Sequence, residues 1–289
     1  MAAPDVLVVG DVMLDVSVDA PALARGGDVN GRVRIRPGGA GGNAAVWAAR
    51  AGARVRLVGR VGDDVPGSIV RRTLEARGVE AALETDADVA TGTMLVVAEA
   101  DERSMVSDPG ANARLRTEDL PAELDATCVL VSGYLLFHQG SEPAARAALD
   151  RARAKRVAVD TASWSLLEAY GPDRFLDAVA PADLLLANER EAEILSGARG
   201  EEAARRLGDR FASIVLKLGA NGAVAVEGDA AGRVDPVETS AVDATGAGDA
   251  FDGALMAALA TGASLQEAAG RACLAGSEAV SHEGPWPPP

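Results

Sequence analysis

A glycine-rich turn followed by an acidic residue is the stretch of this sequence best suited to chemistry. Residues 243–251 read Asp-Ala-Thr-Gly-Ala-Gly-Asp-Ala-Phe, and apolar residues then recur at helical spacing, which predicts a helix beginning near Asp249. The unpaired amides and the dipole at a helix N-terminus attract an anion, and glycines let a phosphate approach the backbone closely. We therefore predict an anion hole at residues 246–249, built on Gly246, Ala247 and Gly248.

The carboxylate of Asp249 at this helix start has two interpretations. It would repel a bound anion unless it had another task, and accepting a proton from an attacking hydroxyl is such a task. Alternatively, Asp249 is simply an aspartate that favours the first turn of a helix. The residues alone leave both open. Because the helix end is positive, we expect a low pKa for Asp249, which makes it a weak base.

Composition limits the class of protein. The 289 residues include 28 Lys and Arg against 43 Asp and Glu, and the formal net charge of −15 argues against nucleic-acid or anionic-membrane partners. Cys128 and Cys273 lie in apolar surroundings, as expected of buried thiols in a reducing compartment. The N-terminus lacks a basic region, and its apolar run over 6–9 is too short for a signal peptide or a membrane span. We expect a cytoplasmic protein.

The chain alternates short apolar runs with helical patterns. Strands are predicted at 5–10, 54–59, 128–132, 156–160, 183–187 and 213–218, and helices at 44–51, 142–154, 173–179, 189–195, 201–208 and 264–281. This alternation predicts an α/β fold with a mostly parallel sheet covered on both faces. Residues 32–36 alternate three arginines with Val33 and Ile35, and 92–98 with 103–107 resemble a hairpin. We expect a β flap with a solvated arginine face.

Small and polar residues follow the first strand. Asp15 comes shortly after the run over 5–10, at the carboxyl end where open α/β sheets bind ligands, although a polar turn is the plain alternative. Gly38-Gly39-Ala40-Gly-Gly-Asn43 then opens the next helix. Asn43 either caps that helix or points its amide at a ligand.

Two further polar motifs follow later strands. Asn188 and Glu191 share one helix face and could orient water around Mg²⁺, but this spacing is also that of a capping box. The segment from Lys217 through Gly219 to Gly222 contains Asn-Gly, a hairpin signal, and its small residues would also let an adenine or ribose lie against the turn.

Several common chemistries are excluded. Neither Lys155 nor Lys217 follows a glycine, so there is no Gly-Lys-Ser/Thr phosphate loop, and no dinucleotide glycine pattern or Gly-x-Ser-x-Gly elbow occurs. His138 and His282 are isolated, which excludes a His/Cys metal cluster. His138 has a local structural role or reaches a substrate.

Taken in order, these motifs give the chain a resemblance to the ribokinase-like, or PfkB, carbohydrate and nucleoside kinases over essentially its whole length. The match rests on residues 10–15, 38–43, 62–67, 188–191, 217–222 and 243–249, and the last is the most diagnostic. The resemblance implies a three-layer α/β/α fold, a small β-sheet lid, ATP as phosphate donor and Mg²⁺. It also implies a single domain over 1–289, with the lid inserted at about 12–36 and 88–107.

The resemblance also implies roles for individual residues. Asp249 matches the general base, and Ala247 with Gly248 matches the anion hole. Asp15, Gly39, Ala40 and Asn43 fall among the sugar contacts; Asn188 and Glu191 match the water network of Mg²⁺; Lys217, Gly219 and Gly222 fall where the nucleotide is held. Asp243, Thr245, Ala279 and Gly284 match a K⁺ site found in part of the family.

Departures from the family leave the substrate open. Ribokinases tend to carry Asn where this chain has Met13 and Lys where it has Ala40. The first hypothesis is an ATP-dependent kinase of a small sugar. The alternatives are a nucleoside kinase of the adenosine, cytidine or pseudouridine type, and a non-catalytic sugar- or nucleotide-binding regulator. The flap strands of this family can pair between subunits, so a homodimer through the lid is also expected.

Overall fold

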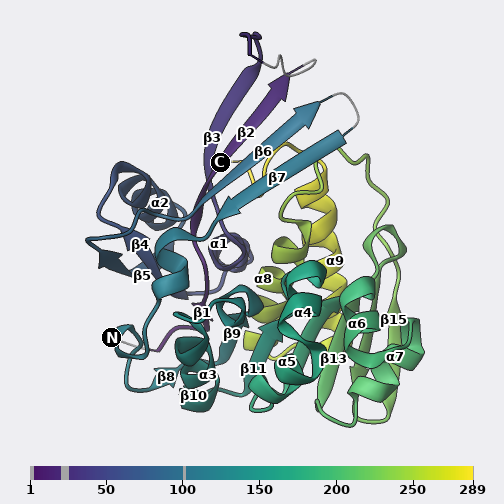
Figure 1. The fold of residues 1–289 in the computed structure, drawn as a ribbon. Coiled ribbons are helices and arrows are strands. Elements are labelled where there is room, and N and C mark those ends of the chain that lie inside the picture. Colours follow the sequence, from purple (N-terminus) through teal and green to yellow (C-terminus); the bar gives the residue numbers. More distant parts are fainter. Residues whose placement is uncertain (1–2, 21–25, 100–101, 289) are drawn as a thin grey trace.

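The computed structural model describes residues 3–20, 26–99 and 102–288. Over these residues a large sheet carries helices on both faces, and a smaller sheet projects from it (Figure 1). Residues 21–25 and 100–101, which fall within the expected lid, lie outside the described residues. No helix in the described ranges is long and apolar enough to cross a membrane.

The central sheet has nine strands within the described residues, in the order β15-β14-β13-β12-β11-β9-β1-β4-β5. They are β1 Val6–Val9, β4 Val55–Gly62, β5 Val79–Asp86, β9 Cys128–Ser132, β11 Arg156–Asp160, β12 Leu184–Asn188, β13 Ser213–Lys217, β14 Ala223–Glu227 and β15 Ala230–Val234. The strands from β5 to β13 pair in parallel, and β14 and β15 pair antiparallel. Strand order reverses between β1 and β9, and such a switch point opens a crevice at the carboxyl ends of the strands.

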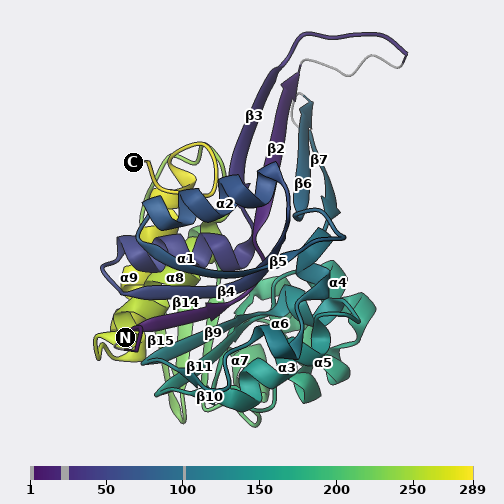
Figure 2. The same cartoon turned by 90° about the vertical axis from the view of Figure 1, so that its left-hand side faces the viewer.

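Helices cover both faces of this sheet (Figure 2). One layer holds α1 Ala40–Arg50, α2 Val65–Ala76, α8 Ala247–Ala260 and α9 Leu265–Val280; the other holds α3 Glu142–Arg151, α4 Trp164–Tyr170, α5 Pro172–Ala178, α6 Glu189–Ser196 and α7 Gly200–Leu207. Alternate residues of β1 enter different cores: Val6 and Val8 pack with α1 and α8, whereas Leu7 and Val9 pack on the opposite face. The three-layer α/β/α arrangement is confirmed.

The smaller sheet is the expected lid. It consists of β2 Met13–Ala20, β3 Arg32–Gly38, β6 Thr93–Glu99 and β7 Glu102–Asp108 in the order β3-β2-β6-β7. Because β2 begins directly after β1, the lid rises from the carboxyl edge of the central sheet (Figure 1). The assignment of the whole chain to one domain stays a prediction.

The expected solvated arginine face of β3 is wrong. Val33 and Ile35 are 59% and 60% exposed, whereas the Arg34 side chain is only 20% exposed and pairs with Glu283. Arg36 contacts the same carboxylate at 3.6 Å. Arg34 and Arg36 therefore face Glu283, a partner distant in sequence that neutralises them, whereas Arg32 is exposed, and Val33 and Ile35 face outward.

Several boundaries differ from those expected. The helix expected at 44–51 begins at Ala40, and the one expected at 142–154 ends at Arg151, after which β10 Ala152–Arg153 pairs with β8 Leu124–Asp125. Strand β5 and helix α4 were not predicted. Short 3₁₀ turns lie at Gly110–Arg114, Thr117–Asp119, Gly133–Phe137 and Gly219–Asn221.

Candidate active site

Asp11 ties together the elements that meet at the switch point. It follows β1, and its Oδ2 accepts the amide of Ala40 at 2.9 Å. Its Oδ1 accepts the amide of Gly41 at 3.4 Å and the hydroxyl of Ser132 at 2.8 Å. Burial raises the pKa of Asp11, although these hydrogen bonds oppose the rise. The first turn of α1 is thereby fixed against β1 and β9.

The predicted anion loop forms the start of α8. Gly246 is the N-cap with φ 75°, in the left-handed region that glycine adopts without strain, and helical residues begin at Ala247. Gly248 is exposed, and Asp249 lies half-buried in the first helical turn. The amide of Ala247 donates to the carbonyl of Ala244 at 3.3 Å, whereas the amides of Gly248 and Asp249 lack intrahelical partners, so an anion can bind there.

Asp249 is held by Asn43 of α1. The Nδ2 of Asn43 donates to Oδ2 of Asp249 at 2.7 Å, and Asn43 is only 5% exposed. The pKa of Asp249 is raised to about 7, mainly because the effect of burial outweighs that of the hydrogen bond from Asn43. The charge of Asp160 raises this pKa further, and that of Lys217 lowers it. The expected low pKa is therefore wrong, because desolvation exceeds the effect of the helix end. A carboxylate of this basicity can accept a proton at neutral pH.

Asp15 lies at the base of the lid, against the glycines that precede α1. A Cβ on Gly38 would lie 2.2 Å from Oδ2 of Asp15, and one on Gly39, at φ 86°, would lie 2.7 Å from the backbone of Val12. Burial, with the nearby charge of Asp11, raises the pKa of Asp15 to about 7. Asp15, Gly39, Ala40 and Asn43 thus gather where the lid meets α1.

Lys217 lies at the end of β13 in a buried ion cluster. Its Nζ donates to Oδ2 of Asp160 at 2.7 Å and to both carboxylate oxygens of Asp252 at 3.1 and 2.9 Å. These carboxylates raise the pKa of Lys217 although burial opposes them. A Cβ on Gly248 would lie 3.7 Å from this Nζ, so the cluster sits directly beneath the anion loop.

Asn188 and Glu191 form a complete capping box at the start of α6. The Oδ1 of Asn188 accepts the amide of Glu191 at 2.9 Å, and Glu191 accepts the amide of Asn188 at 2.8 Å and its Nδ2 at 2.7 Å. Thr161 also donates to Glu191, which is 3% exposed. Among the described residues, no group of three or more His, Cys, Asp or Glu side chains is arranged to hold a metal.

Gly219 and Gly222 shape the turn between β13 and β14, which pair antiparallel as the hairpin signal predicts. Gly219 has φ 57° with open space where a Cβ would be, so a ligand can approach it. At Gly222, φ is 83° and a Cβ would lie 2.1 Å from the carbonyl oxygen of Val234. Only glycine fits this second position.

The structure brings the four residues of the expected K⁺ site together. Asp243 Oδ1 accepts the amide and the hydroxyl of Thr245 at 3.0 and 2.7 Å, and its Oδ2 accepts the amide of Gly284 at 3.0 Å. Ala279 is buried beside Val280, whose carbonyl accepts the amide of Asp243 at 3.2 Å. Carboxylate, hydroxyl and carbonyl oxygens, the donors that hard cations prefer, therefore meet in this loop, and a K⁺ site here stays a prediction.

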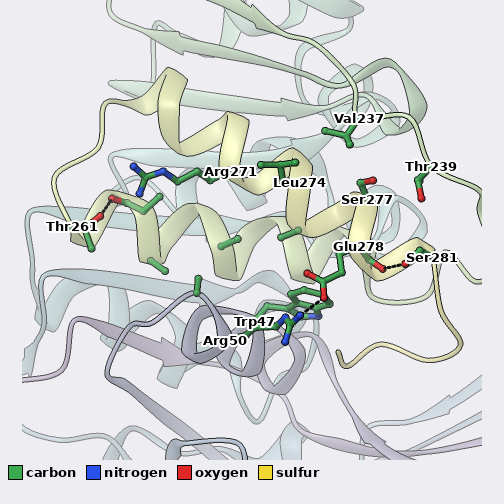
Figure 3. Close-up of a pocket in the computed structure, with 15 residues that line it drawn as sticks. Trp47, Arg50, Val237, Thr239, Thr261, Arg271, Leu274, Ser277, Glu278 and Ser281 are labelled. Atoms are coloured by element: carbon green, nitrogen blue, oxygen red, sulfur yellow. Dashed lines mark hydrogen bonds and ion pairs between the residues drawn. The ribbon is translucent and has the colours of Figure 1, made fainter. Parts of the chain in front are cut away.

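A separate groove of about 640 Å³ lies on the outer side of α1, α8 and α9 (Figure 3). Trp47 and Arg50 of α1, Ala254 of α8, and Leu274 and Glu278 of α9 line it, and Arg50 pairs with Glu278. The groove contains none of the predicted site residues.

Four residues of the site region were not predicted as part of it. Asp160 ends a strand that was predicted, and Asp252 follows Asp249 by one helical turn, so both could have been inferred from position. Tyr134 follows β9, and burial raises its pKa, with a further contribution from the charges of Asp11 and Asp249. Trp286 contacts Asn43, but nothing in the local sequence indicates that contact.

Comparison with known proteins identifies the family of the chain. Residues 3–288 match the family described as pfkB family carbohydrate kinase. Aminoimidazole riboside kinase from Salmonella typhimurium is 31% identical over 268 residues, which cover 86% of this chain and 83% of that protein.

Two solved structures share the fold closely. Adenosine kinase from Sinorhizobium meliloti superposes with a TM-score of 0.88 at 25% identity, covering 99% of this chain and 96% of that one. A fructokinase double mutant from Vibrio cholerae, with fructose, ADP and potassium ion bound, gives a TM-score of 0.83 at 26% identity, covering 99% and 95%. The ribokinase-like fold is thus confirmed, and the chain belongs to the pfkB family of carbohydrate kinases as a phosphotransferase with an alcohol group as acceptor.

Proposed function

We propose that the protein transfers the γ-phosphate of ATP to a primary hydroxyl of a small sugar, with Asp249 as general base. The observation that supports this most is the Asp249 carboxylate itself, whose pKa of about 7 is combined with a position in the first turn of α8. Asp249 accepts the proton of the attacking hydroxyl, and the amides of residues 246–249 stabilise charge on the transferred phosphoryl group.

The nucleotide would lie across the ends of β12 and β13. Lys217, Gly219 and Gly222 are proposed to hold it, which the open space at Gly219 supports. Asn188 and Glu191 would orient the water around Mg²⁺, which supplies neutralisation of phosphate charge. Asp243, Thr245, Ala279 and Gly284 would hold K⁺. The hydrogen bonds of Asp243 with Thr245 and Gly284, and the potassium ion in the related fructokinase, support this.

The acceptor would lie beneath the lid. Asp15 and Asn43, with the backbone of Gly39 and Ala40, are proposed to bind its hydroxyls. A nucleoside acceptor is the second candidate, favoured by Tyr134, whose half-buried ring adds an aromatic surface near Asp11 and Asp249. A purely binding, regulatory role is disfavoured, because it would not require a carboxylate of raised pKa beside the anion loop.

The test of the base assignment is Asp249→Asn. We expect turnover to fall by about 10²- to 10⁴-fold, the usual contribution of a general base, while ATP binding measured by calorimetry changes little. Asp229→Asn, at an exposed position between β14 and β15, is the matched control and should retain full activity. Normal turnover in Asp249→Asn would reject the assignment.

The acceptor is tested with a panel of sugars and nucleosides in an ADP-release assay. Turnover on sugars supports the first candidate, and turnover on nucleosides alone supports the second. ATP binding without turnover on any acceptor would support the regulatory role.

We also propose that the lid mediates a homodimer. Val33 and Ile35 of β3 and Val106 of β7 lie on one face of the lid sheet and are each more than half exposed, at 59%, 60% and 65%.

A further inference from the structure

The 282–287 segment connects several elements of the active site. Glu283 pairs with Arg34 of the lid at 3.0 Å. The amide of Gly284 donates to Asp243 at 3.0 Å. The carbonyl of Pro287 accepts from Arg77, the C-cap of α2, at 2.6 Å. The segment therefore runs along the base of the lid, where Figure 1 marks the C-terminal end of the chain.

Within this segment, Trp286 reaches the residue that holds the base. Its indole Nε1 donates to Oδ1 of Asn43 at 2.7 Å, and Nδ2 of Asn43 donates in turn to Asp249 at 2.7 Å. Trp286 is half-buried, and the guanidinium of Arg77 lies 5.9 Å from the centre of its ring. Three side chains from separate segments thus form one chain of hydrogen bonds that ends on the carboxylate.

The chemistry of the indole gives this chain a direction. An indole N–H can only donate, so the amide atom that faces it must be the carbonyl oxygen. The amide nitrogen of Asn43 must then face Asp249, where it can donate to the carboxylate. A flipped amide would place its oxygen against the carboxylate and its nitrogen against the indole N–H, and both contacts would be repulsive.

On the basis of the proposed role of Asp249, we infer that Trp286 is a positioning residue for the catalytic base: its indole fixes the Asn43 amide in the orientation that holds the Asp249 carboxylate. The effect reaches Asp249 through Asn43, and Trp286 itself touches no reacting atom.

A second contact shows that the same segment supports the anion loop. A Cβ on Gly246 would lie 2.6 Å from Cβ of Pro285, so the two residues pack closely. The carbonyl of Pro285 accepts the indole N–H of Trp47 at 2.8 Å. The 282–287 segment therefore supports the N-terminus of α8 in two ways. Pro285 packs against Gly246 of the anion loop, and Trp286 reaches the Asp249 carboxylate through Asn43.

The test is Trp286→Phe, which keeps an aromatic ring but removes the donor. The groups that face Asp249 are Asn43, Asp11, Asp160, Lys217 and Tyr134, and all remain in this variant. Because the hydrogen bond from Asn43 lowers the pKa of Asp249, weakening it should raise the midpoint of the Asp249 titration. The hydrogen bond from Asn43 to the Asp249 carboxylate is charge-assisted, and weakening such a bond changes an equilibrium roughly tenfold. We therefore expect kcat at pH 7 to fall roughly tenfold, with partial recovery at higher pH.

The titration is read directly by carboxyl ¹³C NMR of aspartate-labelled protein, with Asp249→Asn used to assign the signal. Asn43→Ala is a second variant and should raise the midpoint at least as much as Trp286→Phe. In the double variant the Trp286 substitution should add less than twofold to the loss of kcat, because its effect passes through Asn43. An unshifted midpoint in either single variant, or additive losses in the double variant, would overturn the inference.

The matched control is Trp47→Phe, which removes the indole hydrogen bond from α1 to Pro285 of the same segment and leaves the one from Trp286 to Asn43 in place. We expect a lower melting temperature with the Asp249 midpoint unmoved; an equal shift would mean that the whole segment, and not Trp286, acts on the base. Failure of the proposed function is distinguishable from failure of this inference. Normal turnover in Asp249→Asn would reject Asp249 as the base, but it would leave the NMR titrations unchanged.

Discussion

Ionisation of the buried carboxyl groups of Asp249 and Asp15 lowers stability, whereas ionisation of Asp249 is needed for turnover by the proposed mechanism. Burial is the largest cause that raises the pKa of each to about 7, from the ordinary value of 3.8. Between about pH 4 and pH 7 the folded protein therefore holds protons that the unfolded chain has lost. Stability falls as pH rises through this window, while the fraction of ionised base, and with it turnover, rises.

The expected outcome is a free energy of unfolding lower at pH 8 than at pH 5, and a kcat that increases across pH 6 to 8. Asp249→Asn cannot ionise, so it should be more stable than the wild type at pH 8, by about 1 to 3 kcal/mol. Urea denaturation at both pH values measures this difference. A variant that is equally or less stable at pH 8 would mean that burial does not disfavour the charged form.

Lys217 should contribute strongly to stability because it neutralises buried carboxylates. Its side chain is 14% exposed, and those of Asp160 and Asp252 are 12% and 3% exposed. Lys217→Met leaves these carboxylates without their cation, so we expect a loss of about 3 to 5 kcal/mol of unfolding free energy. Lys155→Met, at an exposed position, should change it by less than about 0.5 kcal/mol. A loss below about 1 kcal/mol at Lys217 would contradict the interpretation.

At the scale of elements, the close packing of α8 on α1 sets the distance between Asp249 and Asn43. A Cβ on Gly253 of α8 would lie 2.2 Å from the carbonyl oxygen of Ala44, so Gly253→Ala must push the helices apart. We expect a loss of about 1 to 3 kcal/mol of stability, as for other overpacked sites, and a fall in kcat.

Gly270→Ala in α9 is the control, because a Cβ there meets no atom within 4 Å. It should stabilise the protein by about 0.5 to 1 kcal/mol through helix propensity, without a change in kcat. Thermal melts and steady-state kinetics of both variants provide the measurement. Equal effects of the two substitutions would show that the α1 contact is not what matters.

The sequence predicts best the elements whose cause is local. The strand around Val6–Val9, the helix after Gly246 and the capping pair Asn188 and Glu191 all follow from periodicity or from residues three apart. These elements also place the candidate catalytic residues at one edge of the sheet.

What the sequence could not give depends on partners distant in the chain. The inward face of Arg34 requires Glu283, and the orientation of Asn43 requires Trp286. The raised pKa of Asp249 requires burial in the assembled fold and the nearby charge of Asp160. Local rules placed Asp249 at a positive helix end and therefore predicted the wrong sign for its pKa shift. Desolvation is a property of the assembled fold, so no spacing in the sequence reports it.

At the scale of the whole molecule, the outer face of the lid presents exposed apolar residues to solvent. The cross-strand register places Ile35, Val16, Leu95 and Val106 in one row, and Asp15 lies on the opposite face with Arg36. The outward row contains Ile35 at 60%, Leu95 at 38% and Val106 at 65% exposure. A contiguous apolar row of this kind is typical of a surface that is covered by another chain.

We therefore expect a dimer in light scattering coupled to size exclusion, and a monomer when Ile35→Glu and Val106→Glu are combined, because charges buried between two lids would lack partners. Leu274→Glu is the control: Leu274 is 58% exposed on α9, in the separate groove and outside the lid sheet, and its substitution should leave the dimer intact. Since Asp15 lies on the other face of the same four strands, loss of the partner should loosen the lid. The KM for the acceptor should then rise severalfold while ATP binding changes little. A wild-type protein that is monomeric at micromolar concentration would contradict the proposed dimer, and a monomeric variant with unchanged KM would show that the lid keeps its position without a partner.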